Sequence, residues 1–178
     1  MKRIFLAITL AVLATVSHAQ VTSWKVTNYE VTFEITNMGI PVDGTLQGLQ
    51  YSVSFDPNQL SESKIMGSVD VNTIDTGIGA RDRHLKNEDY FDVERFPRIH
   101  ISSTNLRKGI DKPYEGSFKL TIRDQSQFLE VPFSFDQQGN QAVLNATFNI
   151  DRRDFEVGGY SLSMGDMVEI SIRMELEK

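Results

Sequence analysis

The fold is decided by residues 142–150, which have the sequence AVLNATFNI. Apolar side chains at the even positions, from Ala142 to Ile150, alternate with Val143 and three polar residues at the odd positions. A period of two is the period of a β-strand, because its successive side chains point to opposite faces. The stretch therefore predicts a strand with one buried, apolar face.

The same alternation recurs in seven other stretches of the chain, at residues 31–35, 49–55, 65–71, 99–101, 114–122, 129–135 and 168–176. Turn-forming residues separate several of them, at 43–44, 56–58, 109–113, 138–140 and 158–159. Eight strands with one apolar face each must bury that face, either in a barrel or between two packed sheets. The mostly short connections favour an all-β, eight-stranded, up-and-down antiparallel barrel.

One segment, from Asp75 to Pro97, lacks the alternation. Residues 80–87 are the one stretch after residue 20 that favours a helix, and at about two turns such a helix depends on tertiary contacts. Phe91 and Phe96 are apolar residues that could dock the segment. We expect a long connection that packs over one end or side of the sheet.

The apolar face of a barrel points inward in a water-soluble protein and outward in an outer-membrane protein. Phe118, Phe133 and Phe148 lie in the middle of their strands, whereas interfacial aromatic residues would lie at strand ends. Small residues also interrupt the apolar face, at Gly67, Gly116, Ala142 and Ala146. Both features favour an inward apolar face. The small residues either leave room for a slim ligand or relieve sheet curvature, and the sequence leaves both open.

Residues 1–19 have the three parts of a secretory signal peptide: basic Lys2 and Arg3, an apolar stretch from Ile4 to Val16, and small residues at Ser17 and Ala19. Thirteen residues form a helix of about 20 Å, too short for a hydrocarbon core of about 30 Å. We expect cleavage after Ala19, a single domain over residues 20–178, export to the periplasm, and a mature chain that does not span a membrane.

Composition excludes several classes of function. The chain has 18 Lys and Arg against 24 Asp and Glu, a formal net charge of −6, whereas binding along nucleic acid favours a basic surface. There is no Cys, which excludes disulfides, thiolate metal sites and a Cys nucleophile. The chain is 40% hydrophobic, enough for a folded core.

Several motifs, in order along the chain, resemble those of YceI-like proteins, which are exported lipid- or polyisoprenoid-binding proteins. They are DTG at residues 75–77, RDRHL at 81–85, FDVERFP at 91–97, GSFKLTIR at 116–123, DRRDFEVG at 151–158 and GDMVEI at 165–170. The resemblance covers residues 22–177. It implies a lipocalin-like barrel whose elongated apolar pore takes a long isoprenoid chain, such as a prenyl phosphate or a quinone tail.

On this hypothesis the protein binds a lipid for transport, storage or stress protection and uses no cofactor. The inward face supplies the candidate pore residues: Phe33, Tyr51, Val53, Val69, Val71, Tyr114, Phe118, Leu120, Phe133, Leu144, Phe148, Ile170 and Ile172. Arg152 and Arg153 are candidates for contact with a lipid head-group phosphate, since Arg binds phosphate in a bidentate manner. A surface ion pair with Asp151 or Asp154 is the competing interpretation.

Two other functions stay open. The first is a non-catalytic structural or stress-related interaction protein whose barrel is filled by its own side chains. The second is an enzyme that uses His84 and Asp82 as an acid–base pair, although no nucleophile accompanies them. No metal site is expected, because His84 and His100 lie on different elements. A mouth-to-mouth homodimer also stays open, since no exposed apolar stripe in the sequence requires one.

Overall fold

A computed structural model describes residues 21–178. It contains eight strands, one α-helix and one 3₁₀ helix: β1 (Ser23–Asn37), β2 (Ile40–Ser54), β3 (Lys64–Asp75), α1 (Gly79–Leu85), β4 (Arg98–Lys108), β5 (Tyr114–Ile122), β6 (Gln125–Gln138), β7 (Gln141–Asp151), η1 (Arg152–Phe155) and β8 (Met164–Glu177). The expected signal peptide, residues 1–19, lies outside the described residues.

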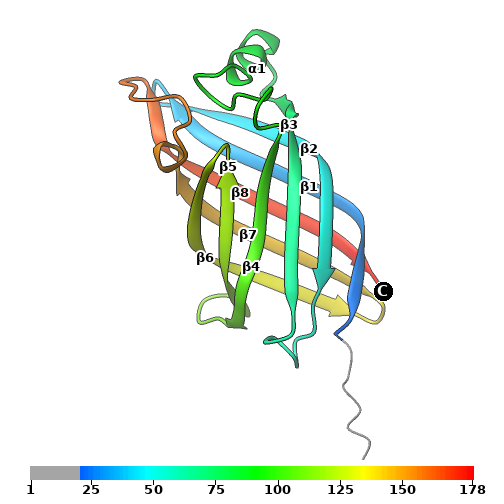
Figure 1. The fold of residues 1–178 in the computed structure, drawn as a ribbon. Coiled ribbons are helices and arrows are strands. Elements are labelled where there is room, and N and C mark those ends of the chain that lie inside the picture. Colours follow the sequence, from blue (N-terminus) through cyan, green and yellow to red (C-terminus); the bar gives the residue numbers. More distant parts are fainter. Residues whose placement is uncertain (1–20) are drawn as a thin grey trace, which may run out of the picture.

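The strands form one closed antiparallel barrel in sequence order (Figure 1). Each strand pairs with the next along the chain, and β1 pairs with β8 from Lys25↔Glu177 to Asn37↔Met164, which closes the barrel. The predicted fold class is therefore confirmed. The strands are longer than the alternating stretches, because backbone hydrogen bonding continues through polar residues at both ends of each stretch.

The first hairpin turn differs from the sequence prediction. The turn is formed by Met38 and Gly39, whose φ values of 52° and 77° are both left-handed, as a two-residue hairpin turn requires. Asp43 and Gly44, predicted as a turn, lie inside β2, where Gly44 is opposite Phe33. A Cβ atom on Gly44 would lie 2.2 Å from Cζ of Phe33, so the glycine makes room for this ring.

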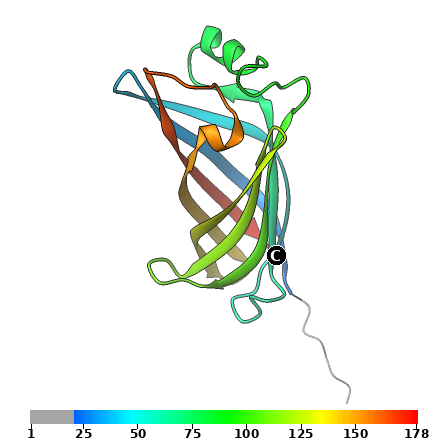
Figure 2. The ribbon, with the colours of Figure 1, turned by 60° about the vertical axis from the view of Figure 1, so that its left-hand side comes forward.

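The two ends of the barrel are built differently (Figures 1 and 2). One end, here called the helix end, carries the turn between β1 and β2, the segment 76–97 that contains α1, and the loop between β7 and β8 that begins with η1. The other end carries the β2–β3, β4–β5 and β6–β7 connections and the C-terminus. The long connection predicted at residues 75–97 thus packs over one end of the barrel.

The buried apolar side chains lie inside the barrel and form two clusters. The larger includes Trp24 and Phe55 and extends to β7 and β8. The smaller contains Val31, Leu46, Val69 and Ile74. The apolar face therefore points inward, as the small residues of that face predicted. No helix in residues 21–178 has the length and apolar character needed to cross a membrane.

Candidate ligand-binding cavity

The helix-end half of the barrel contains a cavity of about 180 Å³. Its wall is made by the inward faces of β1 to β5, β7 and β8. The volume exceeds that of an apolar cavity of about 150 Å³ which accepts a benzene molecule. The cavity is therefore large enough to hold part of an organic ligand.

The wall of the cavity consists almost wholly of hydrocarbon. β-Branched residues dominate it, among them Val31, Ile35, Val42, Val69, Ile99, Ile101, Ile122, Ile150, Val168, Ile170 and Ile172. These residues supply inward methyl groups at every level of the wall and no hydrogen-bonding atoms. Such a surface favours apolar matter and gives no fixed orientation to a polar molecule.

The other half of the barrel is filled by aromatic side chains, here called the aromatic plug: Trp24, Phe55, Tyr114, Phe118, Phe133 and Phe135. The ring centroid of Phe55 lies 4.5 Å from that of Phe135, 5.1 Å from that of Tyr114 and 5.8 Å from that of Phe133. The indole Nε1 of Trp24 donates to the carbonyl oxygen of Phe55 at 2.9 Å. None of these six residues lines the cavity, so the plug fills the part of the barrel beyond the cavity wall.

The segment between β3 and β4 covers part of the mouth of the cavity with Leu85, Tyr90 and Phe91. The helix α1 in this segment has seven residues and no side-chain cap, so local hydrogen bonds must hold it. The backbone N–H and the hydroxyl of Thr76 both donate to the carboxylate of Asp82. These bonds from Thr76, the side-chain bond first, lower the pKa of Asp82, with smaller contributions from nearby positive charges.

Arg81 is the charged group of α1 that lines the cavity. Its Nε donates to the hydroxyl oxygen of Thr76 at 2.7 Å, and its Nη2 donates to the carbonyl oxygen of Thr76 at the same distance. Within residues 21–178 its Nη1 makes no hydrogen bond, so this nitrogen retains donors for a ligand. The mouth thus combines apolar side chains with the guanidinium group of Arg81, which Thr76 holds in position.

Arg152 also borders the cavity, but its guanidinium group is bonded to the protein. The side chain is 4% exposed. Nε donates to the carbonyl oxygen of Gly165, Nη1 to those of Val157 and Gly159, and Nη2 to the carboxylate of Asp166, all at 2.7–2.9 Å. Arg152 therefore ties the loop between β7 and β8 to the end of the barrel.

The comparison with known families agrees with this architecture. The model of the YceI-like domain matches residues 17–176, nearly the whole chain. The chain belongs to the YceI-like family.

Curated relatives of this YceI-like chain are UPF0312 proteins. One from Photorhabdus laumondii is 31% identical over 81 residues, which are 45% of this chain and 42% of the relative. One from Yersinia enterocolitica is 25% identical over 134 residues, 71% of this chain and 69% of the relative.

Solved structures share the YceI-like fold. BcnA of Burkholderia cenocepacia superposes with a TM-score of 0.77 at 24% identity and covers 83% of this chain and 95% of its own. A polyisoprenoid binding domain from Saccharophagus degradans superposes with a TM-score of 0.69 at 11% identity and covers 89% of this chain and 99% of its own. A YCEI protein of Campylobacter jejuni gives the same score at 18% identity, with 98% and 99% coverage.

The structure separates the predicted pore residues of this YceI-like barrel into two groups. Six of them line the cavity: Phe33, Val69, Leu120, Phe148, Ile170 and Ile172. The other seven do not, and for these the predicted place in an open pore is corrected: Tyr51, Val53, Val71, Tyr114, Phe118, Phe133 and Leu144. Four of these seven, Val53, Tyr114, Phe118 and Phe133, pack in or around the aromatic plug, because the bore is filled at that level.

Tyr51 is exposed, although it lies in the alternating part of β2. The ladder between β2 and β3 is irregular between Gln47 and Gln50, where Gly48 has a φ of 70°. Before this bulge the buried residues of β2 have even numbers, Gly44 and Leu46, and after it Val53 is buried. The bulge thus changes which residues of β2 face inward from even to odd numbers. Tyr51 has the odd number of the inward residues after the bulge, so the bulge does not account for its exposure.

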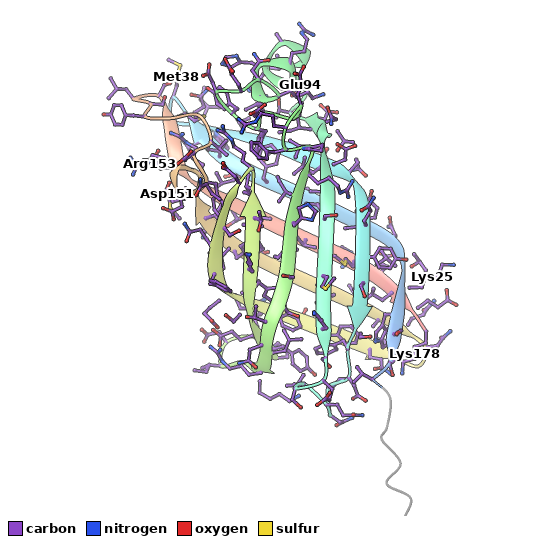
Figure 3. All side chains as sticks on the ribbon, in the orientation of Figure 1. Lys25, Met38, Glu94, Asp151, Arg153 and Lys178 are labelled. Carbon is purple, nitrogen blue, oxygen red and sulfur yellow. The ribbon has the colours of Figure 1, made fainter. Side chains whose placement is uncertain are left out.

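The predicted head-group residues Arg152 and Arg153 lie at the helix end with other partners. Arg153 is exposed and does not line the cavity; its Nε lies 3.6 Å from a carboxylate oxygen of Asp151 and 3.2 Å from one of Asp166 (Figure 3). For Arg153 this matches the competing interpretation of a surface ion pair.

The residues considered for catalysis point to separate partners. Asp82 is bonded to Thr76, whereas the ring of His84 packs against that of Tyr90 with centroids 4.8 Å apart. Among residues 21–178 no group of three His, Asp or Glu side chains is placed to hold a metal ion.

Several lining residues were missed by the sequence analysis, above all Arg81, Leu85 and Tyr90. These come from the segment without alternation, and periodicity carries no information there. The RDRHL motif contained Arg81 and Leu85, but their direction toward the cavity depends on how the segment folds over the barrel.

Proposed function

We propose that this YceI-like protein binds a long apolar lipid of the isoprenoid type. The lipid chain enters the cavity at the helix end, and its far end points toward the half of the barrel that the aromatic plug fills. The observation that carries this proposal is the hydrocarbon wall of the cavity, which has polar groups at its mouth. The similarity in fold to a polyisoprenoid binding domain from Saccharophagus degradans supports this proposal.

The physical chemistry of the wall favours a chain over a compact polar ligand. Each buried CH₂ group contributes about 0.8 kcal/mol, so affinity grows with the length of chain in contact with the wall. A branched isoprenoid chain places methyl groups against the methyl groups of residues such as Val69 and Ile170. Selectivity then depends on the width and depth of the cavity.

Arg81 is our candidate for the head-group contact. It borders the mouth, and its bonds to Thr76 fix its position while leaving Nη1 free within the described residues. A prenyl phosphate would place its phosphate at this point, because guanidinium groups form strong charge-assisted bonds to phosphate oxygens.

The cellular role that follows is that of an exported carrier or store of such a lipid, without catalysis. Residues 1–19 support export through their pattern, and the separate partners of Asp82 and His84 give no support to an acid–base pair. Transfer of a labelled isoprenoid between two vesicle populations would separate a carrier, which speeds the transfer, from a store, which does not.

The binding experiment compares a filled cavity with an intact one. Native mass spectrometry would follow titration of geranylgeranyl phosphate into wild type, Val69→Trp, which fills the cavity, and Phe128→Ala, which changes an exposed residue of β6. We expect at least a tenfold loss of affinity for Val69→Trp and no loss for Phe128→Ala, with circular dichroism to check that all are folded. A folded Val69→Trp protein with wild-type affinity would contradict the proposal.

A separate variant tests the proposed contact between Arg81 and the head group. Arg81→Gln should weaken geranylgeranyl phosphate by about tenfold, the effect of about 1.4 kcal/mol, and leave the uncharged alcohol geranylgeraniol unchanged. Equal loss for both ligands would show that Arg81 acts on the shape of the mouth and has no contact with the phosphate.

A further inference from the structure

The helix end of the barrel presents exposed apolar side chains that the cavity does not use. Met38 and Ile40 belong to the β1–β2 hairpin and are 78% and 66% exposed; Tyr160 and Leu162 belong to the β7–β8 loop and are 78% and 93% exposed. We call these four residues the rim patch. Single exposed apolar residues are ordinary, but a contiguous group on one end of a molecule marks an interaction surface.

The two loops of the rim patch are held together as one platform. The backbone N–H of Met38 donates to the carbonyl oxygen of Ser163 at 2.6 Å. Both loops lie at the same corner of the barrel in Figures 1 and 2, and Figure 3 places Met38 at the outer edge of this corner, beyond Asp151 and Arg153. The two loops that carry the rim patch therefore lie side by side at one corner of the barrel.

The loop that carries Tyr160 and Leu162 is ordered by the protein itself. Nη1 of Arg152 binds the carbonyl oxygen of Gly159, and the hydroxyl of Ser161 accepts from the backbone N–H of Met164 at 3.0 Å. The backbone N–H of Gly158 donates to the carbonyl oxygen of Asp89, which joins this loop to the segment over the cavity mouth. A loop that is already ordered loses little backbone conformational entropy on binding.

The two loops that carry the rim patch lack charged residues, whereas the segment 76–97 at the same end contains charges of both signs. Residues 35–42 and 157–165 contain no Asp, Glu, Lys or Arg, in a chain that is 24% charged. At the opposite end, residues 56–64 and 108–112 contain both acidic and basic residues. Uncharged loops with Met, Ile, Leu and Tyr at their tips match the membrane interface, where apolar side chains enter the acyl region and Tyr rings lie at head-group level.

We infer that the rim patch docks the protein on the surface of an electrically neutral lipid bilayer, with the cavity mouth facing the membrane. The rim patch and the mouth share their loops, since Asn37, Val157 and Met164 line the cavity beside the exposed residues. Docking therefore brings the cavity to the place where a membrane lipid resides. The net charge of −6 disfavours anionic membranes, so a zwitterionic surface is the partner.

The test uses protein expressed from the full-length sequence, with the N-terminus of each preparation checked by mass spectrometry. Flotation with phosphatidylcholine vesicles compares wild type, the double variant Met38→Ser/Leu162→Ser, and the matched control Ile110→Ser/Phe128→Ser, which removes two exposed apolar residues elsewhere. We expect at least a tenfold loss of vesicle binding for the rim variant and no loss for the control.

A reporter locates the contact. Leu162→Trp should show a blue-shifted emission with vesicles and quenching by brominated lipid, while Ile110→Trp should show neither; the native Trp24 is buried and common to both. Anionic phosphatidylglycerol in the vesicles should weaken binding. Equal binding by the rim variant and the control, or stronger binding to anionic vesicles, would overturn the inference.

Two further measurements distinguish membrane docking from dimerisation and from a loss of lipid binding. Analytical ultracentrifugation that finds a dimer in the wild type and a monomer in the rim variant, without vesicle binding by either, would show that a second copy covers the patch and would overturn membrane docking. Native mass spectrometry with geranylgeranyl phosphate should give the same affinity for wild type and rim variant, so a failure of docking and a failure of lipid binding are distinguishable.

Discussion

At the scale of single residues, Arg152 is the charged side chain whose loss should matter most for stability. Burying a guanidinium group is costly unless every nitrogen finds an acceptor. Three carbonyl oxygens and Asp166 satisfy it here, and all lie within residues 157–166. The side chain therefore acts as a structural anchor for the loop that carries half of the rim patch.

Replacing Arg152 by Met should lower the free energy of unfolding by about 3–5 kcal/mol, because the acceptors and Asp166 lose their partner. The matched substitution Arg153→Met removes only exposed ion pairs and should cost at most about 1 kcal/mol. Urea unfolding of both variants measures the difference. Similar losses for the two would contradict the anchoring role.

Asp82 should make the free energy of unfolding of the barrel depend on pH in the acidic range. Its pKa is lower in the folded state, so the stabilisation is present above the ordinary carboxyl pKa of about 3.9 and is lost as pH falls through the lowered folded pKa. Asp82→Asn should therefore have a lower free energy of unfolding than wild type at pH 7. This difference between the two proteins should become smaller below about pH 4. Urea unfolding of both proteins between pH 7 and pH 2.5 measures the difference. A difference in free energy of unfolding that does not change with pH would contradict this role of Asp82.

At the scale of elements, β2 shows how one glycine shapes the cavity wall. Gly44 lies opposite Phe33, whose ring occupies the space where a Cβ would be and also borders the cavity. Strand pairing continues through this position, so Gly44 does not form a turn. Its role is to leave space for the ring of Phe33. A methyl group here would push the ring toward the cavity.

Gly44→Ala should destabilise the protein by about 1–3 kcal/mol, the usual cost of overpacking, and should weaken geranylgeranyl phosphate binding. The double variant Gly44→Ala/Phe33→Leu should recover part of both losses, because leucine is shorter than the ring. Unfolding and titration of the two single variants and the double variant form a double-mutant cycle. Additive effects would show that the two residues do not compete for this space.

At the scale of the whole molecule, the interior of the barrel is divided between a packed half and a hollow half. The aromatic plug fills one half, with Phe55 fully buried, and the cavity occupies the other. Eight strands enclose an interior just wide enough to be filled by side chains or to hold one small ligand. In this barrel, side chains fill one half of the interior and leave a cavity in the other.

Phe133→Ala in the plug should cost about 3–5 kcal/mol of unfolding free energy, because it leaves a void among close-packed rings. Ile170→Ala in the cavity wall should cost less, about 2 kcal/mol or under, since this side chain already faces empty space. Lipid affinity should show the reverse order, with a loss for Ile170→Ala only. Thermal unfolding and native mass spectrometry on both variants measure the two quantities, and equal stability losses would contradict the division.

The number of strands, their antiparallel order and the inward face of most of them followed from the sequence, because alternation is a local property of each strand and each strand pairs with its neighbour along the chain. The helix was placed to within two residues at each end, at Gly79–Leu85 against the expected 80–87. The prediction of a turn at residues 43–44 was wrong. The sequence alone does not distinguish a glycine that makes room for an aromatic ring from a glycine that forms a turn.

The position of the cavity was decided by the tertiary structure. Phe55, Tyr114 and Phe133 are far apart in sequence, and their meeting at one level of the barrel depends on the register of all eight strands. The same holds for Arg152, whose partners come from a loop, and for Arg81, which reaches the cavity because its segment folds over the barrel end. Alternation within a strand determines which side chains face inward, but only the stagger between strands determines which of them fill the interior and which leave it empty.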